Sequence, residues 1–298
     1  MGSVARLKGD LDDVEALLEI ISVLKDVSTN RFFAFAQKKR NFARFLEVFM
    51  SYFDLLEAVD TTCPLVRNNN DGMDIVVLSS EAGFMSQLNG RVSYAAFQEY
   101  QKHPEANVIC IGKKGADKCK MYGMKIAQLF SPNDFPDRYQ MALAVRDVLV
   151  KRMLEGQSGK AIVIHMWAKT FSILKPRVLK LLPASDLVGG EDAEEMDKSQ
   201  KREVRRQKHF IQETTIDNTM KALADIWVSS RLYEIISDMA LVEAAAQAQQ
   251  LESSIEGLST ERNKLRVSFR KASRDELNKA MREVFTQSSM AKNKGKKH

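Results

Sequence analysis

The chain has 298 residues, 44% of them apolar, and a formal net charge of +6 from 45 Lys and Arg against 39 Asp and Glu. This length and apolar content allow two modest domains, or one domain with long extensions. The charge excess is too small for a dedicated nucleic-acid-binding protein. The Lys-rich tail and the Arg-Arg stretch of the charged linker could favour nucleic acid, but no aromatic residues are interleaved with those charges. Nucleic-acid binding is therefore only a weak alternative.

Cysteine content and hydropathy exclude further classes. The three cysteines, Cys63, Cys110 and Cys119, form no CxxC pair, which predicts buried, reduced thiols rather than disulfides. No uninterrupted apolar run reaches ~18 residues, so we expect no membrane span and no direct insertion into a bilayer. The acidic residues near the N-terminus and the lack of an apolar signal core predict a chain without a signal peptide.

The first predicted element is a long helix within residues 1–62. The stretch from Asp10 to Ala58 contains neither Pro nor Gly, and its seam positions recur at alternating intervals of three and four, which is typical of a coiled coil. Such a helix is roughly 70 Å long and needs a partner helix of similar length. The predicted seam consists of Val14, Leu17, Ile21, Leu24, Ser28, Arg31, Phe35, Lys38, Phe42, Phe45, Phe49, Tyr52 and Leu56.

Residues 72–185 are predicted to form an α/β domain. A Pro and an Asn/Asp/Gly cluster within Cys63–Gly72 end the first helix. After them, short buried-strand patterns alternate with amphipathic stretches, which is typical of a largely parallel sheet covered by helices. We predict strands at Asp74–Leu78, Asn107–Ile111, Ile126–Phe130, Ala161–Trp167 and Arg177–Leu182, and helices at Gln87–Lys102 and Asp137–Leu154.

Residues 186–210 are predicted to be a charged linker, and residues 211–298 a second long helix with a basic tail. Within the linker, Gly189–Lys208 has acids followed by bases and few apolar residues, which is typical of a solvated segment. From Ile211 to about Ser289 this segment has no Pro and a single Gly, Gly257, which is a point at which the helix could bend. Its predicted seam consists of Ile216, Met220, Leu223 and Trp227, and further on Leu251, Ile255, Leu258, Arg262, Leu265, Phe269 and Ala272.

The two terminal helices are too long to bury their seams on the small central domain. The economical arrangement is an antiparallel coiled coil of the N- and C-terminal helices, with a Rossmann-like α/β domain inserted between them. We therefore predict the α/β fold class with this architecture.

Motifs for catalysis are incomplete. The nearest match to a phosphate-binding loop is "LEGQSGKA", in which Leu154 stands at the first Gly position and Ala161 at the position of the metal-binding hydroxyl. The four histidines are scattered without metal-ligand spacing, and His165 is expected to be a satisfied, partly buried side chain. We therefore predict no catalytic residue, no metal and no cofactor in this chain.

Three stretches carry a resemblance to a known family. They are "ISVLKDVSTNRFFAFAQKKRNF" (Ile21–Phe42), "LSSEAGFMSQLN" (Leu78–Asn89) together with "IGKKGADKCKMYG" (Ile111–Gly123), and "DMALVEAAAQAQQLESSIEGLSTERNKLRVSFRKAS" (Asp238–Ser273). In order and spacing the chain resembles the gamma subunit, the central shaft, of rotary F-type ATP synthases. It departs from that family at Ala82–Gln87, where one Gly replaces three, at Arg31–Phe33, and at Gln247, which replaces an arginine.

The resemblance implies a non-catalytic rotor within a hexamer of alpha- and beta-type subunits that makes or cleaves ATP. The implied partners are that hexamer, a small epsilon-type subunit and, as an open alternative, the membrane rotor ring. The basic residues from Arg31 to Arg44 would meet an acidic loop of the beta-type subunit. The candidate hexamer contacts are Arg31, Phe33, Phe35, Lys38, Lys39, Arg40, Arg266, Arg270, Ser273, Arg274, Asp275 and Glu276, and the domain-turn residues are Gly83, Asn89, Gly112 and Gly115.

The resemblance places the complex at the cytoplasmic face of a bacterial inner membrane, with an organelle matrix as the alternative. Two other functions remain open from the residues themselves. The chain could be a non-motor coiled-coil adaptor whose α/β domain docks a partner protein. The central domain could also be a degenerate binder of nucleotides or phosphosugars.

Overall fold

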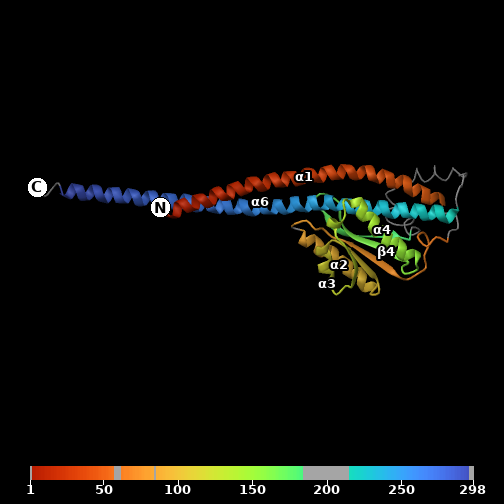
Figure 1. Cartoon of the computed structure of the whole chain (residues 1–298). Helices are drawn as coiled ribbons and strands as arrows, with labels where there is room; N and C mark the ends of the chain where they lie inside the picture. The colour runs from red at the N-terminus through yellow and green to blue at the C-terminus, as the bar shows by residue number, and fades with distance from the viewer. Residues whose placement is uncertain (1, 57–61, 84, 184–214, 295–298) are drawn as a thin grey trace. The chain divides into compact units, whose positions relative to one another are not determined.

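A computed structural model describes residues 2–56, 62–83, 85–183 and 215–294, with side chains placed except at residues 2–3, 40–56, 216 and 287–294. None of the described helices is both long and apolar enough to cross a bilayer. The predicted charged segment at 189–208 lies outside the described residues. The elements are α1 (Gly2–Leu56), β1 (Met73–Leu78), α2 (Ser86–Lys102), β2 (Asn107–Ile111), α3 (Lys113–Met121), β3 (Ile126–Phe130), α4 (Arg138–Leu154), β4 (Lys160–Ala168), β5 (Leu174–Leu182) and α6 (Ile216–Lys294) (Figure 1).

The five predicted strands form one sheet in the order β3-β2-β1-β4-β5. Strands β1 to β4 run parallel, whereas β5 returns antiparallel to β4. Each strand begins within three residues of its predicted start, and the predicted fold class is confirmed. Pro176 lies in β5 at the edge of the sheet, where the lack of a backbone N–H is tolerated.

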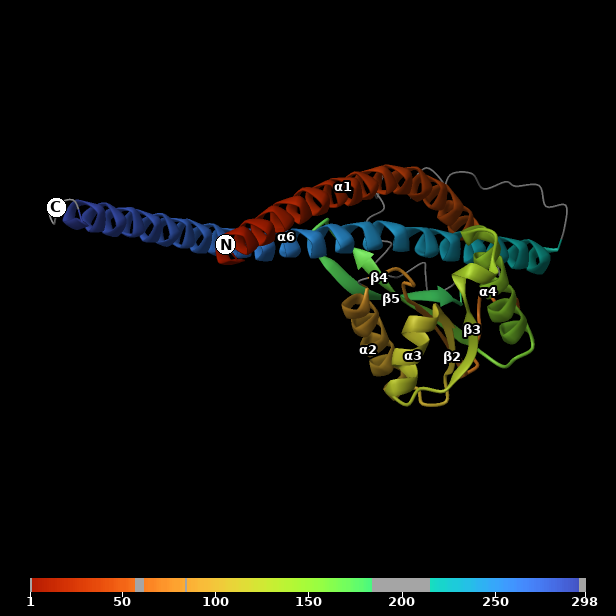
Figure 2. The same ribbon diagram turned by 60° about the vertical axis from the view of Figure 1, so that its left-hand side comes forward.

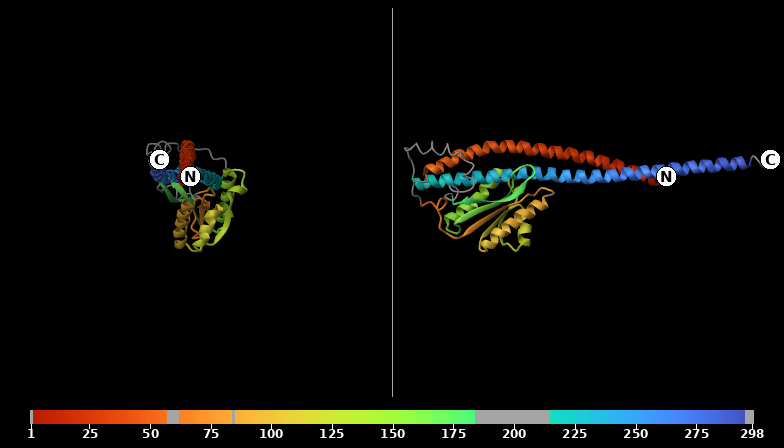
Figure 3. Two further views of the ribbon diagram at one scale, coloured as in Figure 1. Left: turned by 90° about the vertical axis from the view of Figure 1, so that its left-hand side faces the viewer. Right: turned by 180° about the vertical axis from the view of Figure 1, so that it is seen from behind.

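Helices cover both faces of this sheet. Helices α2 and α3 lie side by side on one face, and α4 and α6 lie on the other (Figures 2 and 3). Helix α4 begins where the side chain of Asp137 accepts a hydrogen bond of 2.8 Å from the backbone N–H of Gln140. Its Arg146 forms an ion pair of 3.0 Å with Asp225 on α6. All three cysteines are buried, as predicted.

The chain divides into two compact units, one of Thr29–Gln247 and one of Met1–Ser28 with Ala248–His298. In the second of these units, ion pairs join Glu15 to Arg266 at 3.0 Å and Lys25 to Glu252 at 2.8 Å. Because the partner on α6 moves back along the chain as the residue on α1 moves forward, the two helices there run antiparallel.

The Thr29–Gln247 unit shows the same direction of pairing. Lys39 on α1 pairs with Asp238 on α6, and the hydroxyl of Thr62 donates a hydrogen bond of 2.8 Å to Asp217. The antiparallel pairing of the terminal helices was the central prediction from the sequence, and each unit confirms it for its own residues.

One of the two predicted seam positions in each heptad of α1 is wrong by one residue. Val14, Ile21, Ser28 and Phe35 are buried or half-buried, as predicted. The other position falls on Leu18, Lys25, Phe32 and Lys39, while the predicted Leu17, Leu24, Arg31 and Lys38 are exposed. Leu17 and Leu18 are equally apolar, so hydropathy alone did not separate them. At Lys25 and Lys39, the aliphatic stems lie in the seam while the charged ends reach acids on α6.

The predicted seam of α6 is largely confirmed. Met220 and Trp227 are buried, and all seven positions from Leu251 to Ala272 are half-buried. The helix continues through Gly257 without interruption. The seam positions of α1 from Phe42 to Leu56 lie among the residues whose side chains are not described.

Leu17 and Leu18 offer a matched test of the seam. Leu18 is 9% exposed and Leu17 is 47% exposed. We expect Leu18→Ala to lower the free energy of unfolding by about 2–4 kcal/mol, because it removes buried apolar volume, and Leu17→Ala to lower it by less than about 1 kcal/mol. Urea unfolding followed by circular dichroism measures both. Equal losses would contradict the seam.

Candidate functional site

The loops that follow β1 and β2 are the place where an α/β sheet would bind a phosphate. In this sheet β2 and β4 lie on opposite sides of β1, and ligands of such sheets bind beyond the carboxyl ends of the strands near that reversal. The question is whether the glycines here leave room for a ligand or for the protein itself.

Gly112 and Gly115 leave room for Ser79. A Cβ atom on Gly115 would lie 2.3 Å from the Cβ of Ser79, and one on Gly112 would lie 2.4 Å from its Oγ. Gly112 also has a φ of +97°, which favours glycine. The Ser79 hydroxyl accepts a hydrogen bond of 3.1 Å from the Gly115 N–H and donates to the Ile111 carbonyl at 3.0 Å. These glycines therefore pack α3 against β1 rather than cradle an anion.

Gly83 and Asn89 play different parts in the turn after β1. Gly83 lies in the turn, but a Cβ there would meet nothing within 4 Å, and its φ is not in the left-handed region. Asn89 is buried and clamps the backbone of Ser80, accepting from its N–H at 2.9 Å and donating to its carbonyl at 2.8 Å. Of the four predicted turn residues, Asn89, Gly112 and Gly115 hold this loop in place.

Helix α6 supplies the last contact to this loop. The hydroxyl of Ser80 donates a short hydrogen bond to the carboxylate of Glu243. Burial raises the pKa of Glu243, although the hydrogen bond from Ser80 opposes that shift. The sequence reading did not find Glu243, whose only signal was an acid within an Ala-rich helical stretch. Helix α6 thus contacts this loop at Ser80.

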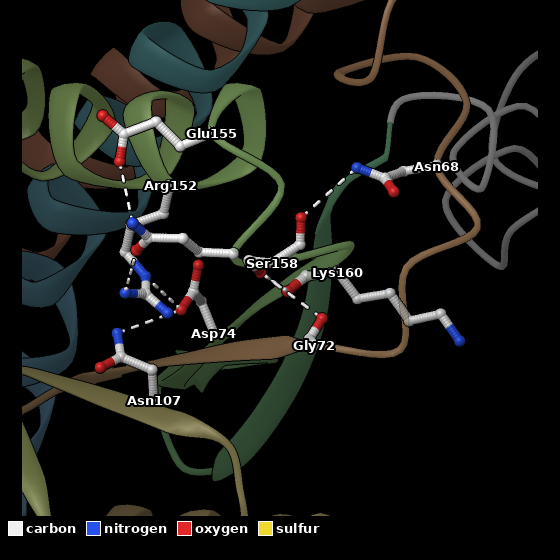
Figure 4. Close-up of polar contacts among 9 residues, drawn as sticks. Asn68, Gly72, Asp74, Asn107, Arg152, Glu155, Ser158 and Lys160 are labelled. Carbon is white, nitrogen blue, oxygen red and sulfur yellow. Dashed lines mark hydrogen bonds and ion pairs between the residues drawn. The ribbon is translucent and has the colours of Figure 1, made fainter.

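The "LEGQSGKA" stretch is a turn between α4 and β4, the reverse of the strand-to-helix order of a phosphate-binding loop. A Cβ on Gly159 would lie 1.9 Å from the carbonyl oxygen of Asn70. The lack of a side chain at Gly159 therefore allows the 67–72 loop to pack against this turn. The Asn70 side-chain amide donates to the carbonyl of Gly156 at 2.5 Å. Figure 4 shows Gly72, at the end of that loop, close to Ser158 and Lys160 of this turn.

A buried carboxylate beside this turn fixes the end of α4. Arg152 and Asn107 converge on Asp74 at the start of β1 (Figure 4). The Nε of Arg152 donates to Asp74 at 2.9 Å, and the Nδ2 of Asn107 donates to the same oxygen at 3.1 Å. Asp74 is 1% exposed. Both contacts reach Oδ1 and join β1 to β2 and α4, which is a structural role, while Oδ2 is buried without a hydrogen-bond partner among the described residues.

His165 on β4 is a satisfied core histidine, as predicted. Burial lowers its pKa to about 4, and the positive charges of Arg177, Arg231 and Lys39 act in the same direction. Its Nδ1 lies 3.0 Å from the carbonyl oxygen of Met166. The imidazole is therefore neutral at pH 7. Within the described ranges, no three His, Cys, Asp or Glu side chains lie close enough to hold a metal.

The candidate contact residues on α1, from Arg31 to Arg40, are called the collar here. Some of their side chains, the outward set, face outward and others face the rest of the protein. Arg31, Phe33 and Lys38 are exposed. Phe35 packs against the core, and Lys39 turns toward α6 to pair with Asp238. Arg40 lies among the residues whose side chains are not described. The outward set is therefore what α1 offers to a partner.

The candidates on α6 lie within the 251–286 stretch. Arg270, Arg274, Asp275 and Glu276 are exposed, Ser273 is half-buried, and Arg266 is exposed and paired with Glu15. Val267, Arg270, Lys271, Arg274, Asp275 and Asn278 line a depression of about 470 Å³.

Beyond them lies an apolar stripe that the sequence reading missed. Leu277, Met281, Val284 and Phe285 are 61%, 47%, 65% and 75% exposed. Their spacing of four, three and one residues places them on one face of α6, and this spacing was the available signal. Toward its C-terminal end, α6 thus has exposed charged residues at 270–276, followed by exposed apolar residues at 277–285.

Comparisons with known proteins agree along the whole chain. The family model for ATP synthase matches residues 3–286. The ATP synthase gamma chain of Campylobacter lari is 19% identical, over 96% of this chain and 98% of that protein. That of Streptococcus equi subsp. zooepidemicus is 24% identical, over 95% of this chain and 97% of that protein.

Solved structures share the fold. The rotor of the Euglena gracilis mitochondrial ATP synthase has a TM-score of 0.55 at 13% identity, covering 93% of this chain and 99% of that chain. A chain of the central stalk and c-ring of the Tetrahymena thermophila mitochondrial ATP synthase has a TM-score of 0.56 at 12% identity, covering 79% of this chain and 99% of that chain.

Gly115 and Gly83 give a matched test of the β1 loop. We expect Gly115→Ala to lower the free energy of unfolding by about 1–3 kcal/mol, because the new methyl group meets Ser79. Gly83→Ala should be neutral or stabilise by up to about 1 kcal/mol, since the space is open. Thermal unfolding of the two variants decides between these expectations, and a larger loss at Gly83 would contradict them.

Glu243→Gln tests the buried carboxylate. Because the folded pKa of Glu243 lies above its ordinary value of 4.5, its contribution is most favourable below the unfolded pKa and is lost as pH rises through the folded pKa. We expect wild type to gain stability relative to Glu243→Gln when the pH falls from 7 to about 5. Urea unfolding at both pH values measures this difference, and a constant difference would contradict the assignment.

Proposed function

Because the chain belongs to the ATP synthase family, we propose that it is the gamma-type central stalk of an F-type rotary ATPase. The observation that carries the proposal is the antiparallel pairing of α1 with α6, in a chain that the family model matches over residues 3–286. The role of such a chain is mechanical. It performs no chemistry, and the catalytic sites belong to the surrounding alpha- and beta-type subunits.

The physical task of the shaft is to bind one conformation of the hexamer better than the others at each orientation. A shaft with identical affinity for all conformations would couple nothing, because only differential affinity shifts a conformational equilibrium. An asymmetric surface is therefore required, and the exposed groups of α1 and α6 supply one.

The outward set of α1 is the proposed lower contact. Arg31 and Lys38 carry exposed positive charge, and Phe33, 60% exposed, lies between them in the sequence. An acidic loop on the beta-type subunit would attract these charges without a large adhesive apolar patch, and salt would weaken the contact. Lys39 contributes indirectly, since its pairing with Asp238 ties α1 to α6 beside the collar.

The far end of α6 is the proposed upper contact. Arg270, Arg274, Asp275 and Glu276 form a charged segment, which agrees with the contact expected from the resemblance. The apolar stripe from Leu277 to Phe285 follows it. Four large apolar side chains on one exposed helical face favour a partner over water, and the inner wall of the hexamer would provide that partner.

We place the complex at a membrane, on the cytoplasmic face of a bacterial inner membrane. The support is that the relatives in Campylobacter lari and Streptococcus equi are bacterial ATP synthase chains. The α/β domain would meet a small epsilon-type subunit and the rotor ring. The solved rotor and F1/c-ring assemblies of Euglena gracilis support the rotor ring as a partner, whereas the epsilon-type subunit rests on the resemblance.

Purification of the tagged chain from its native cells tests this function. We expect two kinds of nucleotide-binding subunits to co-purify, three of each per copy of this chain. Recovery of the chain without them would contradict the proposal and favour a non-motor adaptor.

Charge reversal tests the lower contact. We expect Arg31→Glu with Lys38→Glu to lower the ATP hydrolysis rate of the purified complex several-fold, because like charges would then face the acidic loop. Lys151→Glu on α4, an exposed lysine away from the collar, is the control. An unchanged rate for the double variant would remove the collar from the proposal.

A further inference from the structure

Cys110 on β2 and Cys119 on α3 place two buried thiols on one face of the sheet. Cys110 lies in register with Val77 of β1. Paired residues on neighbouring strands point to the same face, and alternate residues along a strand share a face, so Cys110 shares its face with Val77 and Ser79. The Ser79 hydroxyl accepts a hydrogen bond of 3.1 Å from the Gly115 N–H of α3. Cys110 therefore points toward α3.

Cys119 points back from α3 toward this strand. Residues four apart lie on the same face of a helix, so Cys119 shares a face with Gly115, which packs directly against Ser79. Cys119 is 0% exposed and Cys110 is 1% exposed. The two thiols are hydrogen-bonded to each other. Helix α3, which carries one of them, packs against both α2 and β2 (Figure 2).

The two thiols ionise unequally. The hydrogen bond with Cys110 lowers the pKa of Cys119, burial opposes that shift, and the buried hydroxyl of Ser93 on α2 adds to it. The hydrogen bond with Cys119 and burial both raise the pKa of Cys110. Cys119 is therefore the thiol that ionises first, and the thiolate is the nucleophilic form of cysteine.

We propose that Cys110 and Cys119 form an oxidant-sensitive dithiol, which hydrogen peroxide converts into a reversible disulfide between β2 and α3. In the first step the Cys119 thiolate attacks one oxygen of the peroxide, and the O–O bond breaks. Cys119 becomes a sulfenic acid, and the hydroxide that leaves takes the proton of the Cys110 thiol to form water.

The second step joins the two sulfurs. The Cys110 thiolate attacks the sulfur of Cys119, an S–S bond forms and the S–O bond breaks. The departing hydroxide takes up the proton that Cys119 lost at the outset. The products are one disulfide and two molecules of water, and the two electrons lost by the sulfurs have reduced the peroxide.

Contact between the thiols determines the product. A sulfenic acid without a neighbouring thiol is open to further oxidation to a sulfinic acid, which is irreversible. Here the second thiol is already in place, so the disulfide forms first, and a dithiol reductant restores both cysteines. Helix α3 has nine residues, and local opening of so short an element admits a molecule as small as peroxide. In a reducing compartment the disulfide persists only while the oxidant is present.

Peptide mapping of the full-length chain tests the proposal, with Cys63 as the internal control. Cys63 is also buried, but it begins a turn ahead of β1. The native protein is treated with hydrogen peroxide, blocked with iodoacetamide and digested with trypsin without reduction. Trypsin cleaves between the other two cysteines, so a disulfide appears as two linked peptides. The cleavage sites between them are Lys113, Lys114 and Lys118.

We expect the monomeric protein to yield the linked peptides of Cys110 and Cys119, two hydrogen atoms lighter than their sum, while Cys63 is recovered alkylated. Dithiothreitol should remove the link and restore both thiols. An absent link, a link to Cys63, an equal loss of the Cys63 thiol, or sulfinic acid as the main product at Cys119 would overturn the proposal.

Cys110→Ala and Cys63→Ala form a matched pair of variants. We expect Cys110→Ala to reduce the dithiothreitol-reversible loss of the Cys119 thiol at least ~tenfold, because no second thiol remains in contact to capture the sulfenic acid. Cys63→Ala should leave the yield of linked peptides unchanged. Circular dichroism checks that both variants fold, and the map of the unaltered chain is decisive without them. A fully reversible loss of the Cys119 thiol in Cys110→Ala would overturn the proposal.

This result is independent of the proposed function, because the map needs only the purified full-length chain. The dithiol can fail while the catalytic subunits still co-purify with the chain. It can also be confirmed when they do not.

Discussion

The structure depends on one helical segment that must satisfy two partners. Between Met220 and Val242, α6 buries Trp227, Leu232 and Ile236 among many others. A helix that is apolar on more than one face must be covered on more than one face. Here the sheet covers one side, and α1 covers another through Phe32 and the Lys39–Asp238 pair.

The same helix has a different character further along. From residue 251 to residue 286, the described side chains of α6 are half-buried or exposed, and none is fully buried. The two ranges belong to one helix of 79 residues. One range therefore anchors the chain, and the other keeps most of its surface for outside contacts. A shaft needs both properties, and the sequence separates them without a break in the helix.

The sequence predicted the positions of the helices and strands better than it predicted which of their residues are buried or make tertiary contacts. Strand and helix patterns are local, so β1 to β4 and α4 were found to within one residue at their starts, and β5 to within three. The choice between Leu17 and Leu18, or between Gly83 and Gly115, depends on atoms brought close by the fold. Ser79 and Gly115 are distant in the sequence, but the backbone N–H of Gly115 donates a hydrogen bond of 3.1 Å to the Ser79 hydroxyl. The residue pattern of a single segment does not reveal such a contact. For the same reason Glu243 escaped notice, and Lys39, expected to face outward, turned toward Asp238.

The one-residue displacement of the α1 seam has a consequence for the chain before assembly. It leaves an exposed apolar surface on α1 that consists of Leu17, Ile20, Val23, Leu24 and Val27. A protein with an exposed apolar surface of this kind tends to self-associate. Expression of this chain in excess over the other subunits of its complex would therefore produce aggregates, so the expression levels of the subunits have to match.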